Sequence, residues 1–493
     1  MKRIFRTLLL VVLLLASLTP ALARSKKKAD APPVKYVFYM IGDGMGINQV
    51  IATEQYNAAT GYGPASINFF HFPVRNFITT YSASSLVTDS AAGGTALSSG
   101  VKTYNNAVGV DMDGKPVSFL TEWAKEAGYG TGIATSVGIN HATPACFTAH
   151  AAQRSMYEEI ARQYMTAPID FAAGAAFLTE RGTGHDSAFF ETEARGQGIK
   201  VFHGPAEFKG IENVNGRVLC LSGKTETDLP YAIDRKEDDT TLSDFVTAGI
   251  AYLDAHFGDK GFFFMIEGGK IDYGGHADDA AACFQELTDF ANAMDIVLAF
   301  QAKHPDETLI VVTADHETGG LELGSGKYEM HPELLAGQKM SVGAMTTLFR
   351  STFFPRPQQE GRGNRPPMAP QQEYTPPTWE QVKDFFREHL GLWGSVEVSE
   401  RQEAALKETY DRTFGAGGDR ENNVANLYAV NTRLVAEAVD VLNRNAGLQW
   451  SHGAHTGSPV GLYVKGKCEE AFIPVEDNAQ IAPLIAQLAG YKR

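Results

Sequence analysis

The stretch VKYVFYMIGDGMG, residues 34–46, decides the fold. Its first eight residues are almost all apolar, β-branched or aromatic, which is typical of a strand buried on both faces. The strand leads directly into Gly42-Asp43-Gly44, where the flanking glycines allow a carboxylate to project into a crowded space. Gly-Asp-Gly is also an ordinary turn sequence. Its meaning therefore depends on the residues at the ends of the other strands.

Three further runs resemble the first, at residues 130–136, 261–266 and 308–313. Helical patterns separate them, at residues 118–127, 241–256 and 280–302. Alternating strands and helices favour a mostly parallel sheet with helices on both faces. The sequence therefore predicts an α/β fold with three layers, α/β/α. Ligands of such sheets bind beyond the carboxyl ends of the strands.

The N-terminus has the organisation of an exported protein. Basic residues precede an apolar run over residues 8–15, and Ala-Leu-Ala at residues 21–23 resembles a cleavage site. We expect residues 1–23 to be a signal peptide and residues 24–35 a flexible tail. No later segment is long and apolar enough to cross a bilayer. We expect an exported protein without a membrane anchor, periplasmic in a Gram-negative source and otherwise secreted.

The remaining chain exceeds the usual size of a single hydrophobic core. We expect residues 36–323 to form the first part of the α/β core, residues 324–449 to be a largely helical insertion, and residues 450–493 to return to the core. A proline-rich stretch at residues 354–377 predicts a loop within the insertion.

Capping signals predict the helices of the insertion. Thr378 with Gln381, and Ser399 with Gln402, have the spacing of capping boxes. A further helix is predicted over residues 423–445. In the returning segment we expect a strand at residues 459–465 and a closing helix at residues 481–491.

The charge balance excludes one class of partner. The chain has 43 Lys and Arg against 58 Asp and Glu, a formal net charge of −15. A nucleic-acid-binding face is therefore not expected. The four cysteines are Cys146, Cys220, Cys283 and Cys468, and none has Cys-x-x-Cys spacing, so a thiolate metal site is not expected either. In an oxidising compartment they could form disulfides, with three possible pairings.

Acids and histidines gather where the predicted strands end. The third strand leads into residues 267–276 and the fourth into residues 314–317. At one edge of a parallel sheet these acids would repel one another unless cations held them. Zinc accepts mixed oxygen and nitrogen donors, and a harder cation accepts the remaining carboxylates. The candidate ligands are Asp43, Glu267, Asp272, His276, Asp315 and His316.

A second signal lies at residues 87–97, VTDSAAGGTAL. A helix beginning at Ser90 would present unpaired N–H groups and the positive end of its dipole to an anion. Ser90 could also be a simple N-cap. Glycines in a helix are costly relative to alanine, so Gly93 and Gly94 indicate a close approach, which we interpret as room for a phosphoryl group.

The order of four motifs resembles that in alkaline phosphatases. They are Thr88-Asp89-Ser90-Ala91-Ala92, Glu267 with Asp272 and His276, Thr313-Ala314-Asp315-His316, and Gly453-Ala454-His455-Thr456-Gly457. The resemblance covers residues 36–323 and 451–493, and leaves the insertion outside.

The resemblance implies a role for each matching residue. Ser90 is similar to the nucleophile that becomes a phosphoserine, Arg154 to the arginine that holds two phosphate oxygens, and Asp89 to the acid that steadies it. Two zinc ions are implied, one held by Asp272, His276 and His455, and the other by Asp43, Asp315 and His316. A third ion, usually magnesium, would be held by Asp43, Thr143 and Glu267.

Two neighbours of the third site vary within that family. His141 lies where some bacterial members have aspartate, and Tyr273 where lysine, histidine or tryptophan occurs. The identity of the third ion therefore stays open, and His141 is either a ligand or a hydrogen-bonded core histidine.

The sequence predicts a metal-dependent phosphomonoesterase that acts on small phosphate monoesters, with a homodimer expected from the resemblance. The alternatives are a phosphodiesterase of the same superfamily and a non-catalytic protein that binds phosphate or metal. A sulfatase is disfavoured because no Cys-x-Pro-Ser-Arg-like motif is present.

Overall fold

The sheet is built around β1 (Tyr36–Gly42), the strand predicted at residues 34–41. The computed structural model describes residues 33–493 except 225, 325–327, 355–373, 416–417 and 420. Nine strands follow one another in the order β2 (Val74–Ile78), β15 (Val460–Gly466), β8 (Thr308–Thr313), β1, β7 (Phe262–Gly268), β3 (Gly130–Thr135), β4 (Phe171–Gly174), β6 (Val218–Leu221) and β5 (Lys200–His203).

The strands from β8 to β5 are all parallel, and β15 runs antiparallel to both of its neighbours. β1 and β7, both buried at every residue, carry the apolar runs that parallel sheets require. The prediction of a mostly parallel sheet is confirmed, and the four strands predicted first are β1, β3, β7 and β8.

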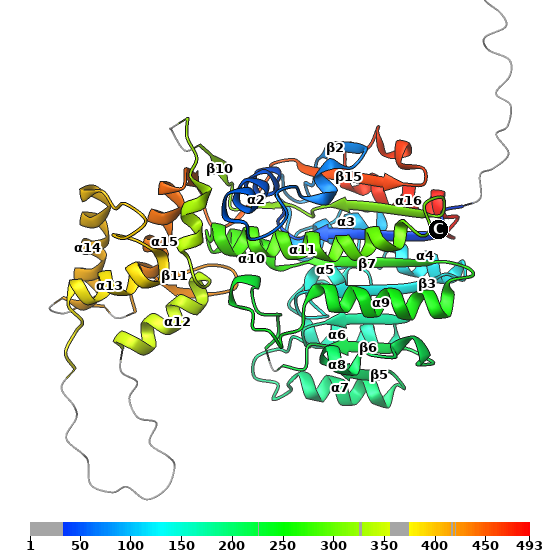
Figure 1. Cartoon of the computed structure of the whole chain (residues 1–493). Helices are drawn as coiled ribbons and strands as arrows, with labels where there is room; N and C mark the ends of the chain where they lie inside the picture. Colours follow the sequence, from blue (N-terminus) through cyan, green and yellow to red (C-terminus); the bar gives the residue numbers. More distant parts are fainter. Residues whose placement is uncertain (1–32, 225, 325–327, 355–373, 416–417, 420) are drawn as a thin grey trace, which may run out of the picture. The chain divides into compact units, whose positions relative to one another are not determined.

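Helices surround the sheet, as Figure 1 shows. α9 and α11 pack on each other and against β7, whereas α4 and α16 pack on each other and against β7 and β1 respectively. The helices are α2 (Ile47–Thr60), α3 (Ser90–Ser99), α4 (Leu120–Glu126), α5 (Ala142–Ala145), α6 (Tyr157–Thr166), α7 (Ser187–Gly196), α8 (Gly204–Glu207), α9 (Leu242–Phe257), α10 (Lys270–His276), α11 (Ala280–Gln301), α12 (Val342–Phe353), α13 (Trp379–Leu390), α14 (Glu400–Phe414), α15 (Arg433–Asn445) and α16 (Ile481–Ala489).

The described residues of the predicted insertion are largely helical, with a hairpin before α15 and a short strand at its end. Both predicted capping boxes are formed, at the N-termini of α13 and α14. The prediction of a helix over residues 423–445 is wrong in its first part, where β11 (Asn423–Ala425) and β12 (Val430–Thr432) form an antiparallel hairpin and α15 begins only at Arg433. The Asn426 side chain accepts hydrogen bonds from the backbone N–H groups of Tyr428 and Ala429, which favours a turn over a helix.

Short strand pairs lie near the two ends of the predicted insertion. β10 (Glu322–Leu323) pairs with β13 (Leu448–Gln449), and β9 (Glu317–Thr318) pairs with β14 (His455–Thr456). Val34–Arg493 form one compact unit. The division into core, insertion and return therefore stays a prediction, and residues 355–373 of the predicted proline-rich loop lie outside the described residues.

Two other expectations need correction. The tail predicted at residues 24–35 ends earlier, because the Val34 N–H donates to Leu488 O (2.9 Å) and the Lys35 N–H to Glu307 O (2.9 Å), which ties both residues to the core. The four cysteines, which could have formed disulfides, are all free thiols.

The capping box of α9 allows a test of local stability. Thr241 Oγ1 accepts from the Asp244 N–H (3.1 Å), and Asp244 Oδ2 accepts from the Thr241 N–H (2.9 Å). We expect Thr241→Ala to lower the free energy of unfolding by about 1 kcal/mol, measured by chemical denaturation. Thr247→Ala, at an exposed position of the same helix, is the control and should not destabilise. Equal stability of the two variants would contradict the role of the cap.

Candidate active site

The predicted site residues converge at the carboxyl edge of the sheet. Asp43 follows β1, Glu267 lies near the end of β7, and Asp315 follows β8. Glu267 pairs in register with Ile41, two residues before Asp43. Parallel strands deliver their carboxyl ends to one edge, so residues far apart in sequence meet there. Asp43, Glu267, Asp272 and Asp315 are all fully buried.

Asp272, His276 and His455 form the first group that could hold a metal ion. Their ligand atoms all lie within 4.8 Å of one another. His276 Nε2 lies 3.3 Å from Asp272 Oδ2 and 3.1 Å from His455 Nε2. Asp272 and His276 share one face of α10 because they are four residues apart.

The hydrogen bonds made by the Nδ1 atoms of His276 and His455 explain why a cation fits between the two rings. His276 Nδ1 lies 2.9 Å from Gly453 O and His455 Nδ1 lies 3.0 Å from Thr88 O, so each Nδ1 carries a proton and donates to a carbonyl. In the neutral rings both Nε2 atoms then present lone pairs to each other across 3.1 Å. A cation between them removes this repulsion. The nitrogen and carboxylate donors of this group suit zinc.

The second group is Asp43, Asp315 and His316. His316 Nε2 lies 3.5 Å from Asp43 Oδ1 and 3.4 Å from Asp315 Oδ2, and Asp315 Oδ2 has no hydrogen-bond partner among the described residues. The His316 ring stacks on that of His455 with centroids 3.6 Å apart. The two groups are therefore adjacent, and the second set also fits zinc.

A third group shares Asp43. Its ligand atoms come from Asp43, His141 and Glu267. Thr143 Oγ1 lies 3.4 Å from Asp43 Oδ2, and Glu267 Oε1 is buried without a hydrogen-bond partner among the described residues. Carboxylate and hydroxyl oxygens suit magnesium, whereas the His141 nitrogen is a donor that softer cations accept.

The electrostatics of the edge show the same need for positive charge. Burial, and then the neighbouring Asp315 and Asp272, raise the pKa of Asp43 well above its usual value. Burial raises the pKa of Asp315 to about 7 and that of Glu267 to about 8. Like charges brought together in a buried site disfavour ionisation. Without cations, these carboxyl groups are hard to ionise together.

His141 is held neutral. Burial, followed by the Arg154 guanidinium, lowers the pKa of His141 to about 3. Arg154 Nη2 donates to His141 Nε2 across 3.0 Å, and His141 Nδ1 has no partner among the described residues. The structure therefore agrees with both interpretations of His141. The side chain is hydrogen-bonded to Arg154, and it also belongs to the third group of possible metal ligands.

Ser90 lies where the second group meets Arg154. Its Oγ is 3.2 Å from His316 Nε2, 3.5 Å from Asp43 Oδ1 and 3.4 Å from Arg154 Nη1. Ser90 is the first residue of α3, and Asp89 is the N-cap, which corrects the interpretation of Ser90 itself as a cap. Asp89 Oδ1 accepts from the Ala92 N–H and Asp89 Oδ2 from Arg154 Nη1 (3.4 Å). One carboxylate thus orients both the helix and the guanidinium.

Gly93 and Gly94 of α3 allow close packing of neighbouring segments. A Cβ on Gly93 would lie 3.0 Å from Asp315 O, and one on Gly94 would lie 3.1 Å from Cys146 Sγ. The small residues let α3 approach the segment that carries Asp315 and the helix α5, and the interpretation as room for a phosphoryl group is wrong for these two positions.

Three site residues were missed by the sequence analysis. The Thr135 hydroxyl donates to Glu267 Oε2, and the Thr318 hydroxyl donates to Asp272 Oδ1. Both threonines lie at strand ends, where such partners could have been sought. Tyr428 comes from the insertion, and its ring stacks on Tyr273. No sequence signal points to it.

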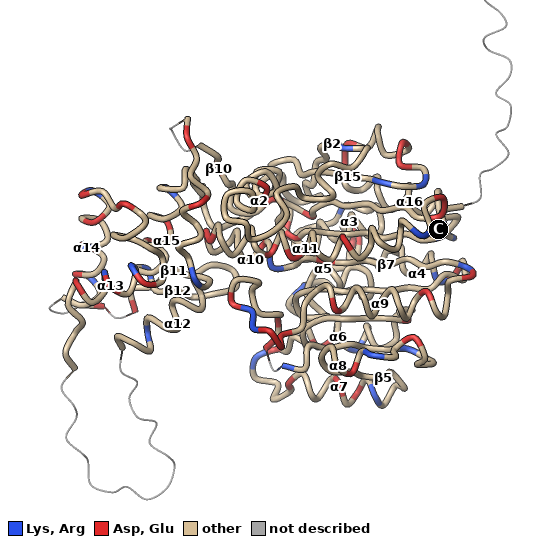
Figure 2. The backbone as a smooth tube through the Cα atoms, in the orientation of Figure 1, with Lys and Arg blue, Asp and Glu red and all other residues tan. Residues whose placement is uncertain are grey.

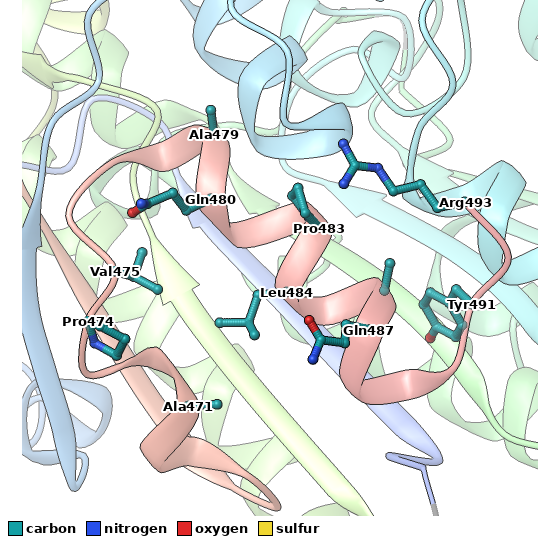
Figure 3. Close-up of a pocket in the computed structure, with 11 residues that line it drawn as sticks. Ala471, Pro474, Val475, Ala479, Gln480, Pro483, Leu484, Gln487, Tyr491 and Arg493 are labelled. Atoms are coloured by element: carbon teal, nitrogen blue, oxygen red, sulfur yellow. The ribbon is translucent and has the colours of Figure 1, made fainter.

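Cavity size does not identify this site. A hollow of about 710 Å³ lies along α16 (Figure 3), where its lining includes Val475, Pro483, Leu484 and Tyr491. No residue of the three groups lines it. Figure 2 shows Lys and Arg interspersed with Asp and Glu along the described part of the chain.

Comparisons with known proteins agree with this geometry. The family model for alkaline phosphatase matches residues 34–172 and 179–491. This range includes residues 324–449, which the motifs had left outside the resemblance. Alkaline phosphatase 4 of Bacillus subtilis is 30% identical over 477 residues, covering 94% of this chain and 90% of the relative.

Solved structures show the same fold. The cold-active alkaline phosphatase from a psychrophilic Shewanella species superposes with a TM-score of 0.71 at 27% identity, covering 92% of this chain and 99% of that one. The alkaline phosphatase of Thermus thermophilus also has a TM-score of 0.71, at 25% identity, with coverage of 94% and 92%.

Asp315→Asn separates charge repulsion from metal binding. In chelator-treated protein at pH 8.5 we expect this variant to raise the Tm by roughly 1–3 °C, because it removes one of the facing carboxylates. After loading with zinc it should bind less metal than the parent, measured by elemental analysis. Asp306→Asn, at an exposed position before β8, should change neither quantity. A lower Tm for metal-free Asp315→Asn would contradict the repulsion.

Proposed function

The chain belongs to the alkaline phosphatase family, and from this premise we propose that it hydrolyses phosphate monoesters through a phosphoserine on Ser90. The family membership makes the protein a phosphatase. The observation that carries the finer proposal is the position of Ser90 Oγ, 3.2 Å from His316 Nε2 and 3.4 Å from Arg154 Nη1. A nucleophile thus lies between a candidate metal group and a cation that can hold phosphate.

The family implies metal cofactors, and we assign them to the three groups. Asp272, His276 and His455 would hold one zinc ion, and Asp43, Asp315 and His316 a second. Asp43, Thr143 and Glu267 would hold magnesium, with His141 beside it. When bound, such divalent ions stabilise negative charge on the attacking and leaving oxygens of a phosphoryl transfer.

The protein's own residues hold the substrate and accept the phosphoryl group. Arg154 would hold two non-bridging oxygens, because its planar guanidinium matches their spacing, and Asp89 keeps it oriented. Ser90 Oγ loses its proton and forms the new bond to phosphorus as the bond to the alcohol oxygen breaks, and the departing alcohol oxygen takes up a proton. Water then attacks the phosphoserine, releases inorganic phosphate and restores the Ser90 hydroxyl.

Export stays a prediction, because residues 1–32 lie outside the described part of the chain. Among the described residues, no helix has both the length and the apolar character needed to cross a membrane. We propose a periplasmic or secreted enzyme. The homodimer expected from the resemblance also stays a prediction.

Replacement of Ser90 tests the nucleophile. In protein loaded with zinc and magnesium, Ser90→Ala should abolish labelling by a phosphate donor and lower kcat for p-nitrophenyl phosphate by at least about 1,000-fold. Its zinc content should equal that of the parent. Ser98→Ala removes a buried hydroxyl of the same helix that donates to Thr95 O and should leave labelling intact. Phosphoenzyme in the Ser90→Ala variant would refute the assignment.

A comparison of esters separates the monoesterase from the diesterase alternative. We expect p-nitrophenyl phosphate to be turned over far faster than bis-p-nitrophenyl phosphate. Arg154→Ala should lower kcat/KM for the monoester by about 100-fold, since a charge-assisted pair is lost. It should affect the diester less, because the diester offers one terminal oxygen fewer. A parent enzyme that favours the diester would favour the alternative.

A further inference from the structure

The β11–β12 hairpin brings one side chain of the insertion to the active site. Figure 1 shows this hairpin on the side of the insertion nearest α10. Its turn is held by Asn426, whose N–H donates to Ala429 O (2.9 Å) and whose side chain accepts from the Tyr428 and Ala429 N–H groups. These bonds fix the backbone on which Tyr428 is carried.

The base of the hairpin is also tied down. Arg350 of α12 donates to Asn423 Oδ1 (2.7 Å) and to Thr432 Oγ1 (3.1 Å), so one guanidinium links both strands. Arg433 donates to Asn422 Oδ1 (3.1 Å) and Asn423 O (3.2 Å). Side-chain hydrogen bonds therefore hold the hairpin against α12 and the start of α15.

The Tyr428 ring lies against the wall of the first metal group. It stacks on Tyr273, with centroids 3.7 Å apart and planes at 23°, and it meets His276 edge-on at 5.2 Å. The Tyr273 hydroxyl donates to Asp228 Oδ1 across 3.4 Å, and this bond orients the Tyr273 ring. The stack then fixes where the Tyr428 hydroxyl points.

The Tyr428 hydroxyl is buried and has no hydrogen-bond partner among the described residues. The Tyr428 ring lies 6.1 Å, centroid to centroid, from the ring of His141, whose Nε2 accepts from Arg154 Nη2 across 3.0 Å. A buried hydroxyl normally has a partner, and leaving it without one is costly. An anion held by Arg154 would supply that partner. The ring packing alone does not require a hydroxyl, because phenylalanine would stack equally well.

We propose that Tyr428 is a substrate-positioning residue whose hydroxyl donates to a phosphate oxygen that Arg154 holds. The inference rests on the proposed function, because it needs phosphate at Ser90. It gives the insertion a role in the reaction, since a hairpin that carries none of the metal ligands completes the phosphate site. The substrate class is a phosphate monoester dianion, whose terminal oxygens can engage both Arg154 and Tyr428.

The test removes only the hydroxyl. In the zinc- and magnesium-loaded enzyme, Tyr428→Phe should raise KM for p-nitrophenyl phosphate and the inhibition constant of inorganic phosphate, each by about tenfold, because a hydrogen bond to a charged group is lost. The kcat should change by less than about threefold if the bond is equally strong in the ground and transition states. Leu427→Ala, at the neighbouring exposed position of the turn, is the matched control and should match the parent.

A binding measurement gives a second readout without turnover. In a metal-loaded Ser90→Ala background, calorimetry with inorganic phosphate should show about tenfold weaker binding when Tyr428→Phe is added. Unchanged phosphate affinity in Tyr428→Phe, with an active parent, would overturn the positioning role and leave the proposed function standing. A loaded parent that neither binds phosphate nor hydrolyses the monoester would overturn both.

Discussion

Four buried carboxylates and four histidines lie together at the carboxyl edge of the sheet, and the rest of the site is arranged around the repulsion between those carboxylates. Burial, reinforced by repulsion from neighbouring acids, raises the pKa values of Asp43, Asp315 and Glu267 and favours their neutral forms. Bound divalent cations reverse this effect because they favour ionised ligands. The same charges that destabilise the metal-free site therefore bind the cations from which a phosphatase obtains its activity.

The fold resists this repulsion through hydrogen bonds from outside the groups. The Gly44 N–H donates to Asp315 Oδ1 (3.2 Å), and the Thr318 and Thr135 hydroxyls donate to Asp272 and Glu267. The histidines are oriented in the same way, through carbonyls from other segments. These proposed ligands are thus positioned by neighbours outside the three groups, which would preorganise the site for metal.

The sequence was most informative where the signal is local. The strands β1, β3, β7 and β8 carry dense apolar runs, and the boxes of α13 and α14 depend on residues three apart, so both were predicted. The hairpin before α15 was missed because its β-branched residues are few and its turn depends on the Asn426 side chain. Most of the proposed ligands could be predicted to lie together because they follow strongly apolar strands. Tyr428 could not be found, since only tertiary structure places it beside Tyr273.

The position of the insertion explains how a segment so long can be carried without disturbing the ligands. It leaves the core shortly after His316 and returns shortly before His455, and two short strand pairs join these points. In the inner pair, His455 lies opposite Thr318, and in the outer pair Leu323 lies opposite Leu448. Because the ends of the insertion are held together, its length adds little to the entropy lost on closing the loop. The inner pair keeps His455 in register with the segment that carries His316. A segment anchored between two proposed metal ligands is well placed to supply a residue to the substrate of the proposed site.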